Sequence, residues 1–184
     1  MTERETPDSI IGFWFSKQVA KCWFNSTPEL DQTIKSKFEL TYQIAKEGSL
    51  AHWQTSPLGC LALILLFDQF PLNMYRGLSQ CFATEAQARE ISDIAISKCF
   101  DEELYDKQKV FVYMPYMHSE NLNDQNTAIE LYTRAGLKDN LRFAIHHHDI
   151  VERFGRFPHR NKILDRKNTS DEDEYLKSDK AFLG

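Results

Sequence analysis

The side chains best suited to chemistry lie in one stretch, IHHHDIVERFGRFPHRNKILDR, which runs from Ile145 to Arg166. Three histidines in a row precede a turn that is rich in arginine. Between Arg153 and Lys167 the chain carries six of its 22 lysines and arginines but a single acid, Asp165. Guanidinium groups form paired hydrogen bonds with carboxylates and phosphates, so this basic turn favours binding of a small anion.

The anion-binding hypothesis gives roles to residues in and around this turn. The ligand-binding candidates are Arg153, Arg156, Arg160 and Asn161 in the turn itself, with Arg76, His118 and Asp124 from other segments. The candidates for proton transfer are His147, His159, Glu120 and Asp68. In the alternative hypothesis the arginines bind helix-end carbonyls and acids, and the protein is a scaffold for protein partners or self-association. The residue pattern leaves both hypotheses open.

The histidines lie on an expected helix. At 100° per residue one stripe holds mostly apolar side chains, namely Phe143, Ala144, His147, Ile150, Val151 and Phe154. We therefore expect His147 to be buried and to form a hydrogen bond through a ring nitrogen. Gly155 suits a left-handed helix cap, and Pro158 prevents simple continuation.

A family resemblance covers most of the chain. The segment RFGRFPHRN at 153–161 resembles the signature of the bacterial family known as domain of unknown function 924. Similar family segments are FDQFPLNMYRG at 67–77, YMPYMHSENLNDQ at 113–125 and FWF at 13–15. The resemblance implies an all-α fold of antiparallel helical hairpins in a tetratricopeptide-like superhelix or bundle, and it implies no activity. The chain departs from the family at Leu72, where arginine is usual, and at Asp165, where glycine is usual.

Composition and charge exclude several classes of function. The chain has 184 residues, 42% of them hydrophobic, which fits one domain over 1–184 with a C-terminal helix or tail at 167–184. Its net charge of −5 disfavours nucleic acids and anionic membranes as partners, although the basic turn leaves a small RNA or nucleotide ligand open as an alternative. The four cysteines are widely spaced and the N-terminal sequence is polar, so we expect a reduced, cytoplasmic protein.

Motifs for the common cofactors are missing from the sequence. There is no H-E-x-x-H for zinc, no G-x-S-x-G for a serine nucleophile, and no glycine-rich nucleotide loop. Adjacent histidines of a helix diverge by 100°, so His146, His147 and His148 cannot all bind one ion. We expect no metal and no cofactor.

Capping residues mark the expected helix starts. They are Asp8 or Ser9, the box Ser26–Glu29, Ser56 with Pro57, Thr84, Ser119, and the box Asn168–Glu172. We expect the acids at 171–174 to be solvated. Glu120 and Asp124 share a helix face, and together with His118 they either face the basic turn or only form an acid-rich helix start, which the helix dipole favours.

One expected helix is apolar on every side and therefore buried. It begins at Pro57 and should end at Pro71, which places Asp68 near its C-terminal end. A carboxylate there needs a cationic partner, and the candidates are Arg76, Arg156 and Arg160.

Overall fold

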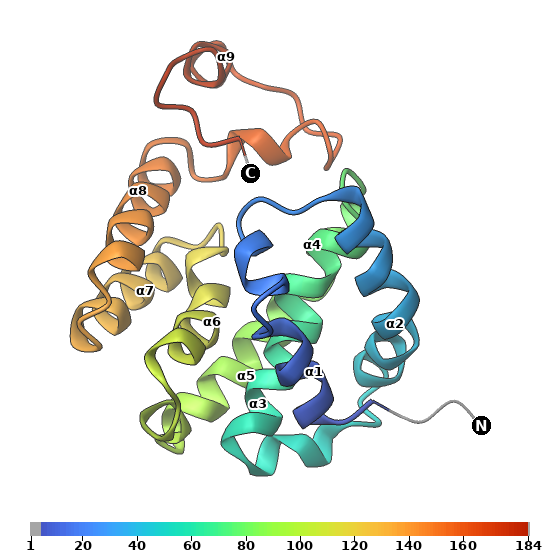
Figure 1. Ribbon diagram of the computed structural model, residues 1–184. Coiled ribbons are helices and arrows are strands. Elements are labelled where there is room, and N and C mark those ends of the chain that lie inside the picture. The colour runs from blue at the N-terminus through green and yellow to red at the C-terminus, as the bar shows by residue number, and fades with distance from the viewer. Residues whose placement is uncertain (1–4, 184) are drawn as a thin grey trace. The chain divides into compact units, whose positions relative to one another are not determined.

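A computed structural model describes residues 5–183 of the protein, and every regular element among them is helical (Figure 1). The all-α prediction is confirmed for these residues. The chain forms two compact units: unit 1 takes the residues up to Arg76 together with Gln80–Pro115, and unit 2 takes Gly77–Ser79 together with the residues from Tyr116 onward. The prediction of one domain over the whole chain stays a prediction.

Unit 1 is built around an aromatic core. Its helices are α1 (Pro7–Trp14), α2 (Pro28–Lys46), α3 (Pro57–Ile64), α4 (Phe70–Met74), α5 (Glu85–Ser97) and the first part of α6 (Asp106–Met117), with short turns η1 (Val19–Cys22), η2 (Ala51–Thr55) and η5 (Phe100–Glu103). Helices α1 and α5 pack against α3, and α2 packs against α4. The core contains the rings of Trp14, Phe38, Phe70 and Phe111. The Phe70 ring lies 4.7 Å from that of Phe38 and 5.5 Å from that of Trp14. All four side chains are buried.

Pro71 does not end the apolar helix, which corrects the sequence prediction. After α3 the chain passes through a π-helical segment, η3 (Leu65–Gln69), and continues into α4 with Pro71 in its first turn. The Phe70 N–H bonds to the Leu65 carbonyl, five residues back, and this wider turn accommodates a residue that has no N–H to donate. Asp68 therefore lies inside a continuous helical segment, 3% exposed, and not at a helix end.

The continuous segment Pro57–Met74 is longer than the sequence indicated. With 18 residues and a mean hydropathy of 1.4 it is long and apolar enough to cross a bilayer by length and composition alone. However, 78% of it is buried inside the protein, and the core helix of a globular protein passes the same test.

Several helix caps differ from the predicted ones. Thr6 caps α1 and forms a capping box with Ser9, with Pro7 at the first helical position. Thr27 caps α2 in place of Ser26, the first residue of the predicted box, and the Ser26 hydroxyl binds Asp31. Thr84 precedes α5, but its hydroxyl donates to the Phe67 carbonyl 2.7 Å away. Ser56 caps α3, as predicted.

Unit 2 consists of a helical hairpin and an irregular C-terminal region. Helices α7 (Leu122–Arg134) and α8 (Lys138–Phe154) pack side by side, and Gly136 provides the left-handed residue in the turn between them (Figure 1). Asn121, not Ser119, caps α7. Gly155 closes α8 with φ of 70°, as predicted, and the chain then forms η6 (Pro158–Arg160) and α9 (Ser170–Leu176).

Gly59 offers a test of the packing of α3. A Cβ at this position would lie 2.0 Å from the Trp53 carbonyl oxygen, so alanine must displace backbone. We expect Gly59→Ala to lower the free energy of unfolding by about 2 kcal/mol or more, although alanine is the better helix former. The control is Gly12→Ala in α1, which meets nothing within 4 Å and should stabilise by up to about 1 kcal/mol. Urea unfolding of both variants measures the difference, and equal effects would contradict this packing.

Candidate functional site

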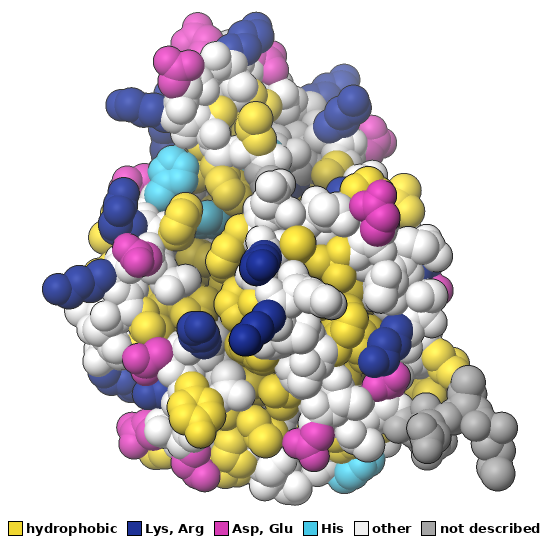
Figure 2. Space-filling model, in the orientation of Figure 1, with side chains coloured by type: hydrophobic (Ala, Val, Ile, Leu, Met, Phe, Trp, Pro, Cys, Tyr) yellow, Lys and Arg dark blue, Asp and Glu magenta, His cyan; other side chains and the backbone are white. Residues whose placement is uncertain are grey.

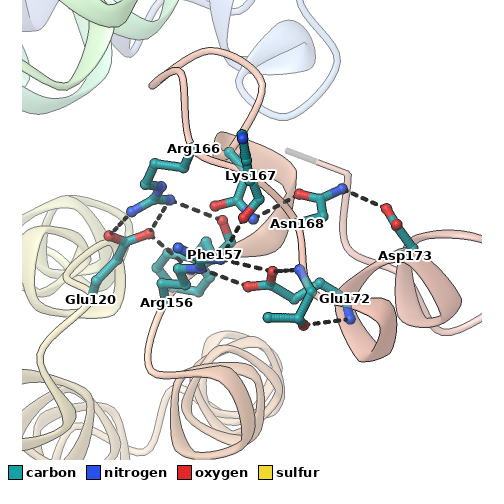
Figure 3. Close-up of polar contacts among 10 residues, drawn as sticks. Glu120, Arg156, Phe157, Arg166, Lys167, Asn168, Glu172 and Asp173 are labelled. Atoms are coloured by element: carbon teal, nitrogen blue, oxygen red, sulfur yellow. Dashed lines mark hydrogen bonds and ion pairs between the residues drawn. The ribbon is translucent and has the colours of Figure 1, made fainter.

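Arg156 of the basic turn is neutralised by an acid of α9. The Arg156 Nε donates to Glu172 Oε1 at 2.6 Å, and Nη2 donates to Glu172 Oε2 at 2.8 Å and to the Lys167 carbonyl at 2.9 Å (Figure 3). Glu172 also receives the Thr169 N–H, which completes the predicted capping box of α9. These contacts, above all the Arg156 hydrogen bonds, lower the pKa of Glu172 to about 2. Glu172 was expected to be solvated and is buried, because it balances the Arg156 charge.

A second acid, Glu120, binds the other side of the basic turn. Its Oε2 accepts from Arg166 Nη1 at 2.7 Å, and its Oε1 accepts from Arg166 Nη2 at 2.9 Å and from the Phe157 N–H at 2.8 Å (Figure 3). Burial opposes ionisation of this carboxyl, but the Arg166 and Phe157 donors hold its pKa below the ordinary value. The expectation that Glu120 faces the basic turn is met by these contacts.

Asp165 has the backbone conformation that turns the chain just before Arg166. Its φ of 53° is left-handed, a conformation that glycine adopts at little cost and that aspartate tolerates better than most residues. Glycine is usual here in the family that the sequence resembles. The choice of residue at position 165 is therefore limited by the backbone turn that precedes Arg166. The Arg166 N–H donates to the Asn161 carbonyl at 2.8 Å.

Arg160 and Asn161 are buried in the centre of the turn. The Arg160 guanidinium lies over the Phe157 ring, 4.7 Å from its centroid, and Nη2 donates to the His118 carbonyl at 2.9 Å. The Asn161 amide donates to the Asn168 side chain at 2.8 Å. The backbone of His118 thus meets the turn, as the sequence suggested, through its carbonyl.

Asp124 and Arg76 each contact a side chain outside the basic turn. The Asp124 Oδ2 accepts from the Ser119 hydroxyl at 2.5 Å. In unit 1, Arg76 forms a two-bond pair with Asp31, with Nε–Oδ2 of 2.6 Å and Nη2–Oδ1 of 3.1 Å. Their roles in ligand binding stay predictions.

Asp68 does not use two of its three candidate partners. Arg76 is bound to Asp31 and Arg156 to Glu172. The Asp68 carboxylate accepts from the Gln69 amide at 2.6 Å, and that amide also contacts the Met114 sulfur at 3.2 Å. The expected burial is confirmed, and pairing with Arg160 stays a prediction.

His147 is buried, 4% exposed, and its Nδ1 lies 2.8 Å from the Phe143 carbonyl, as the helical stripe predicted. Phe143 itself is 58% exposed, against that prediction. The reason is that Phe157, Tyr175 and the C-terminal segment cover only the later part of α8. Burial lowers the pKa of His147 to about 3, and burial together with Arg160 lowers that of His159 to about 4.

Arg153 differs from the other arginines of the stretch because it lines an open cavity of about 390 Å³ in unit 2. The lining residues are His146, Asp149, Ile150, Arg153, Glu174, Tyr175, Ser178 and Lys180. The contribution of α9 and the segment after it has no signal in the sequence, because a residue pattern does not show which helix face the C-terminal segment covers.

Three residues of α8 form a candidate group of metal ligands. One ligand atom from each of His148, Asp149 and Glu152 lies within 4.8 Å of the others. Asp149 and Glu152 are exposed, and groups of exposed acids are common without a metal. We therefore assign no metal to this group.

Arg156→Lys tests whether the basic turn serves the fold. Lysine keeps the charge but loses the paired geometry with Glu172, so the free energy of unfolding should fall by about 1 to 3 kcal/mol. Arg153→Lys is the matched control, because Arg153 is exposed and forms no such pair, and it should leave stability unchanged. Equal stability of the two variants in chemical unfolding would show that the Glu172 pair contributes nothing.

His147 predicts a pH dependence of stability. Its pKa is about 3 in the folded state, whereas an unfolded histidine titrates near 6.5. Because the unfolded chain binds the proton first, this contribution is complete above pH 6.5 and is lost as the pH falls toward 3, at up to about 1.4 kcal/mol per pH unit. His147→Phe should reduce the slope measured between pH 6.5 and 5, a range above the ordinary pKa of carboxyls. An unchanged slope would contradict the buried neutral histidine.

Known proteins resemble this chain in sequence and in fold. Residues 10–180 match the family described as "Bacterial protein of unknown function (DUF924)". A solved structure of a protein of unknown function from Agrobacterium tumefaciens, ATU0120, is similar, with 38% sequence identity, a TM-score of 0.88, and coverage of 93% of this chain and 96% of that one. No curated protein matches. The chain therefore belongs to the DUF924 family of bacterial proteins of unknown function.

Proposed function

We propose that the protein binds a small anionic molecule in the cavity lined by α8 and the C-terminal segment of unit 2. The observation that carries the proposal is the contrast between two sets of cations. Arg156 and Arg166 are each neutralised by a glutamate. Arg153 and Lys180 line the cavity, and among residues 5–183 neither cation has a hydrogen bond or an ion pair.

The cavity has the size of a small-molecule site. Its volume of about 390 Å³ lies within the usual range for such pockets. The Arg153 guanidinium lies over the Phe154 ring, 4.6 Å from the centroid, which limits its orientations. A guanidinium from α8 and an ammonium from the segment after α9 suit a carboxylate or phosphate group.

Two acids limit the charge of the ligand. Asp149 and Glu174 line the same cavity as Arg153 and Lys180. A chain of phosphates would meet these carboxylates and be repelled, so the proposal favours a ligand with a single anionic group. The same argument disfavours nucleic acid.

The catalytic part of the hypothesis has less support. Glu120 is held by Arg166 and the Phe157 N–H and is not poised to exchange a proton. We therefore propose a binding function, and acid–base roles of His147, His159 and Asp68 stay predictions.

A tetratricopeptide-like interaction scaffold is the second candidate. It is favoured by the pairs Arg156–Glu172 and Glu120–Arg166, which give the basic turn a structural purpose without any ligand. It is also favoured by Phe143 and Ile145, which α8 exposes at 58% and 43%. A partner protein would then cover this part of α8.

The test is binding of inorganic phosphate and of hexanoate, followed as a shift in unfolding temperature. A ligand at a hundredfold excess over Kd stabilises by about 2.7 kcal/mol. We expect at least one anion to stabilise the wild type, Arg153→Ala and Lys180→Ala to lose the effect, and Lys162→Ala, an exposed lysine outside the cavity, to keep it. Stabilisation that survives the Arg153 and Lys180 changes would place the anion elsewhere and contradict the proposal.

A further inference from the structure

We propose that the ligand of this cavity carries an aromatic ring, and that the ring binds in a histidine-lined recess that Phe182 of the C-terminal segment occupies in this structure. The inference rests on the proposed anion site and names the class of its ligand, an aromatic monoanion. The Phe182 ring lies 4.5 Å from the His147 ring, 5.0 Å from the His159 ring and 6.4 Å from the His146 ring, measured between centroids. We call these three histidines the histidine recess.

The recess is shaped for a flat ring. Its floor is Phe157, which is fully buried and lies 5.5 Å from the His147 ring and 5.6 Å from the His159 ring. Phe182 meets His146 and His159 nearly edge to face, at interplanar angles of 80° and 84°. Such contacts stabilise any ring with a similar face and edge, including one brought by a ligand.

Two of the three histidines of the recess, His147 and His159, are uncharged at neutral pH. Burial keeps the pKa of His147 near 3 and that of His159 near 4, so both rings are neutral at pH 7. A neutral imidazole presents both an aromatic face and a ring nitrogen. Among residues 5–183 the Nδ1 atom of His159 has no hydrogen-bond partner and is buried, and a polar group on a bound ring could supply one.

The recess and the cavity adjoin. His146 lines the cavity and contacts Phe182, and the hydroxyl of Tyr175, another cavity residue, accepts the Phe182 N–H at 2.8 Å. Lys180 is two residues from Phe182, so their Cα atoms are separated by no more than about 7 Å. A ring joined to a carboxylate by a short chain can therefore reach the recess and Lys180 together.

Phe182 is held weakly enough to be displaced. It follows α9 in a segment without regular structure and is partly buried against Ile150, Val151 and Phe157. The segment is tied back by the bond to Tyr175 and by the Ala181 N–H to the Ser178 carbonyl at 3.1 Å. A ligand ring would replace the same ring contacts, so the exchange costs little more than these bonds.

The decisive probes are 3-phenylpropanoate and hexanoate, which share a carboxylate and differ in the ring. In the wild type, 3-phenylpropanoate should speed hydrogen exchange of the Phe182 amide, because the bond to Tyr175 opens, whereas hexanoate should leave it unchanged. Binding of 3-phenylpropanoate with full protection of this amide would overturn the proposal, and this measurement needs no variant.

Phe182→Ala gives an independent test by removing the competing ring. Its affinity for 3-phenylpropanoate should rise about tenfold, since the recess no longer has to be vacated, while its affinity for hexanoate should not change. Leu183→Ala is the control, because Leu183 is 70% exposed and should leave both affinities unchanged. Equal changes for the two acids in Phe182→Ala would overturn the aromatic recess.

Benzyl alcohol separates failure of the recess from failure of the anion site. This neutral ring should bind Phe182→Ala and should be insensitive to an added Arg153→Ala change, whereas 3-phenylpropanoate should lose affinity with that change. If benzyl alcohol binds and 3-phenylpropanoate ignores Arg153, the anion site is wrong. If benzyl alcohol does not bind and both acids depend on Arg153, the recess is wrong.

Discussion

The structure of unit 2 depends on the carboxylate of Glu120, which binds Arg166 through two hydrogen bonds and receives the Phe157 N–H (Figure 3). Glu120 lies in the turn before α7, and its partners lie 37 and 46 residues later, so this group fixes the basic turn beside the helical hairpin. With Phe157 held, the rings of His147, His159 and Phe182 pack around it. The histidine recess therefore follows from a charged pair that does not itself meet the ligand.

The cations of this region fall into two sets, those neutralised by a glutamate within the fold and those that line the cavity. The sequence shows a basic stretch with one nearby acid, but Glu120 and Glu172 bring the missing negative charges from outside it. Once Arg156 and Arg166 are neutralised, Arg153 and Lys180 remain at an open cavity. Figure 2 shows histidine and hydrophobic side chains exposed together near α8 and the C-terminal segment, where the cavity and the recess are found. The binding proposal and the structural role of the basic turn are therefore compatible.

Local sequence signals predicted the helices well, whereas features that depend on contacts between distant residues were not predicted. The cap at Ser56, the left-handed Gly155 and the burial of His147 follow from neighbours within one or two helical turns. The prediction that Pro71 ends the apolar helix was wrong, because a π-helical turn accommodates the proline. The spacing of residues in the sequence does not reveal such a turn. Glu172 looked like a solvated acid because its partner, Arg156, is 16 residues away. The cavity was missed because its second wall is the C-terminal segment, whose docking onto α8 has no local signal.

The coupling free energy between Glu120 and Arg166 tests this account most directly. Both side chains are about one-quarter exposed, so the pair lies between surface and buried pairs in strength. A double-mutant cycle with Glu120→Gln and Arg166→Gln, measured by urea unfolding, isolates the pair from its separate contacts. The account predicts a coupling of about 1 kcal/mol or more, accompanied by faster exchange of the Phe157 amide in Glu120→Gln. A coupling near zero with the Phe157 amide still protected would contradict it.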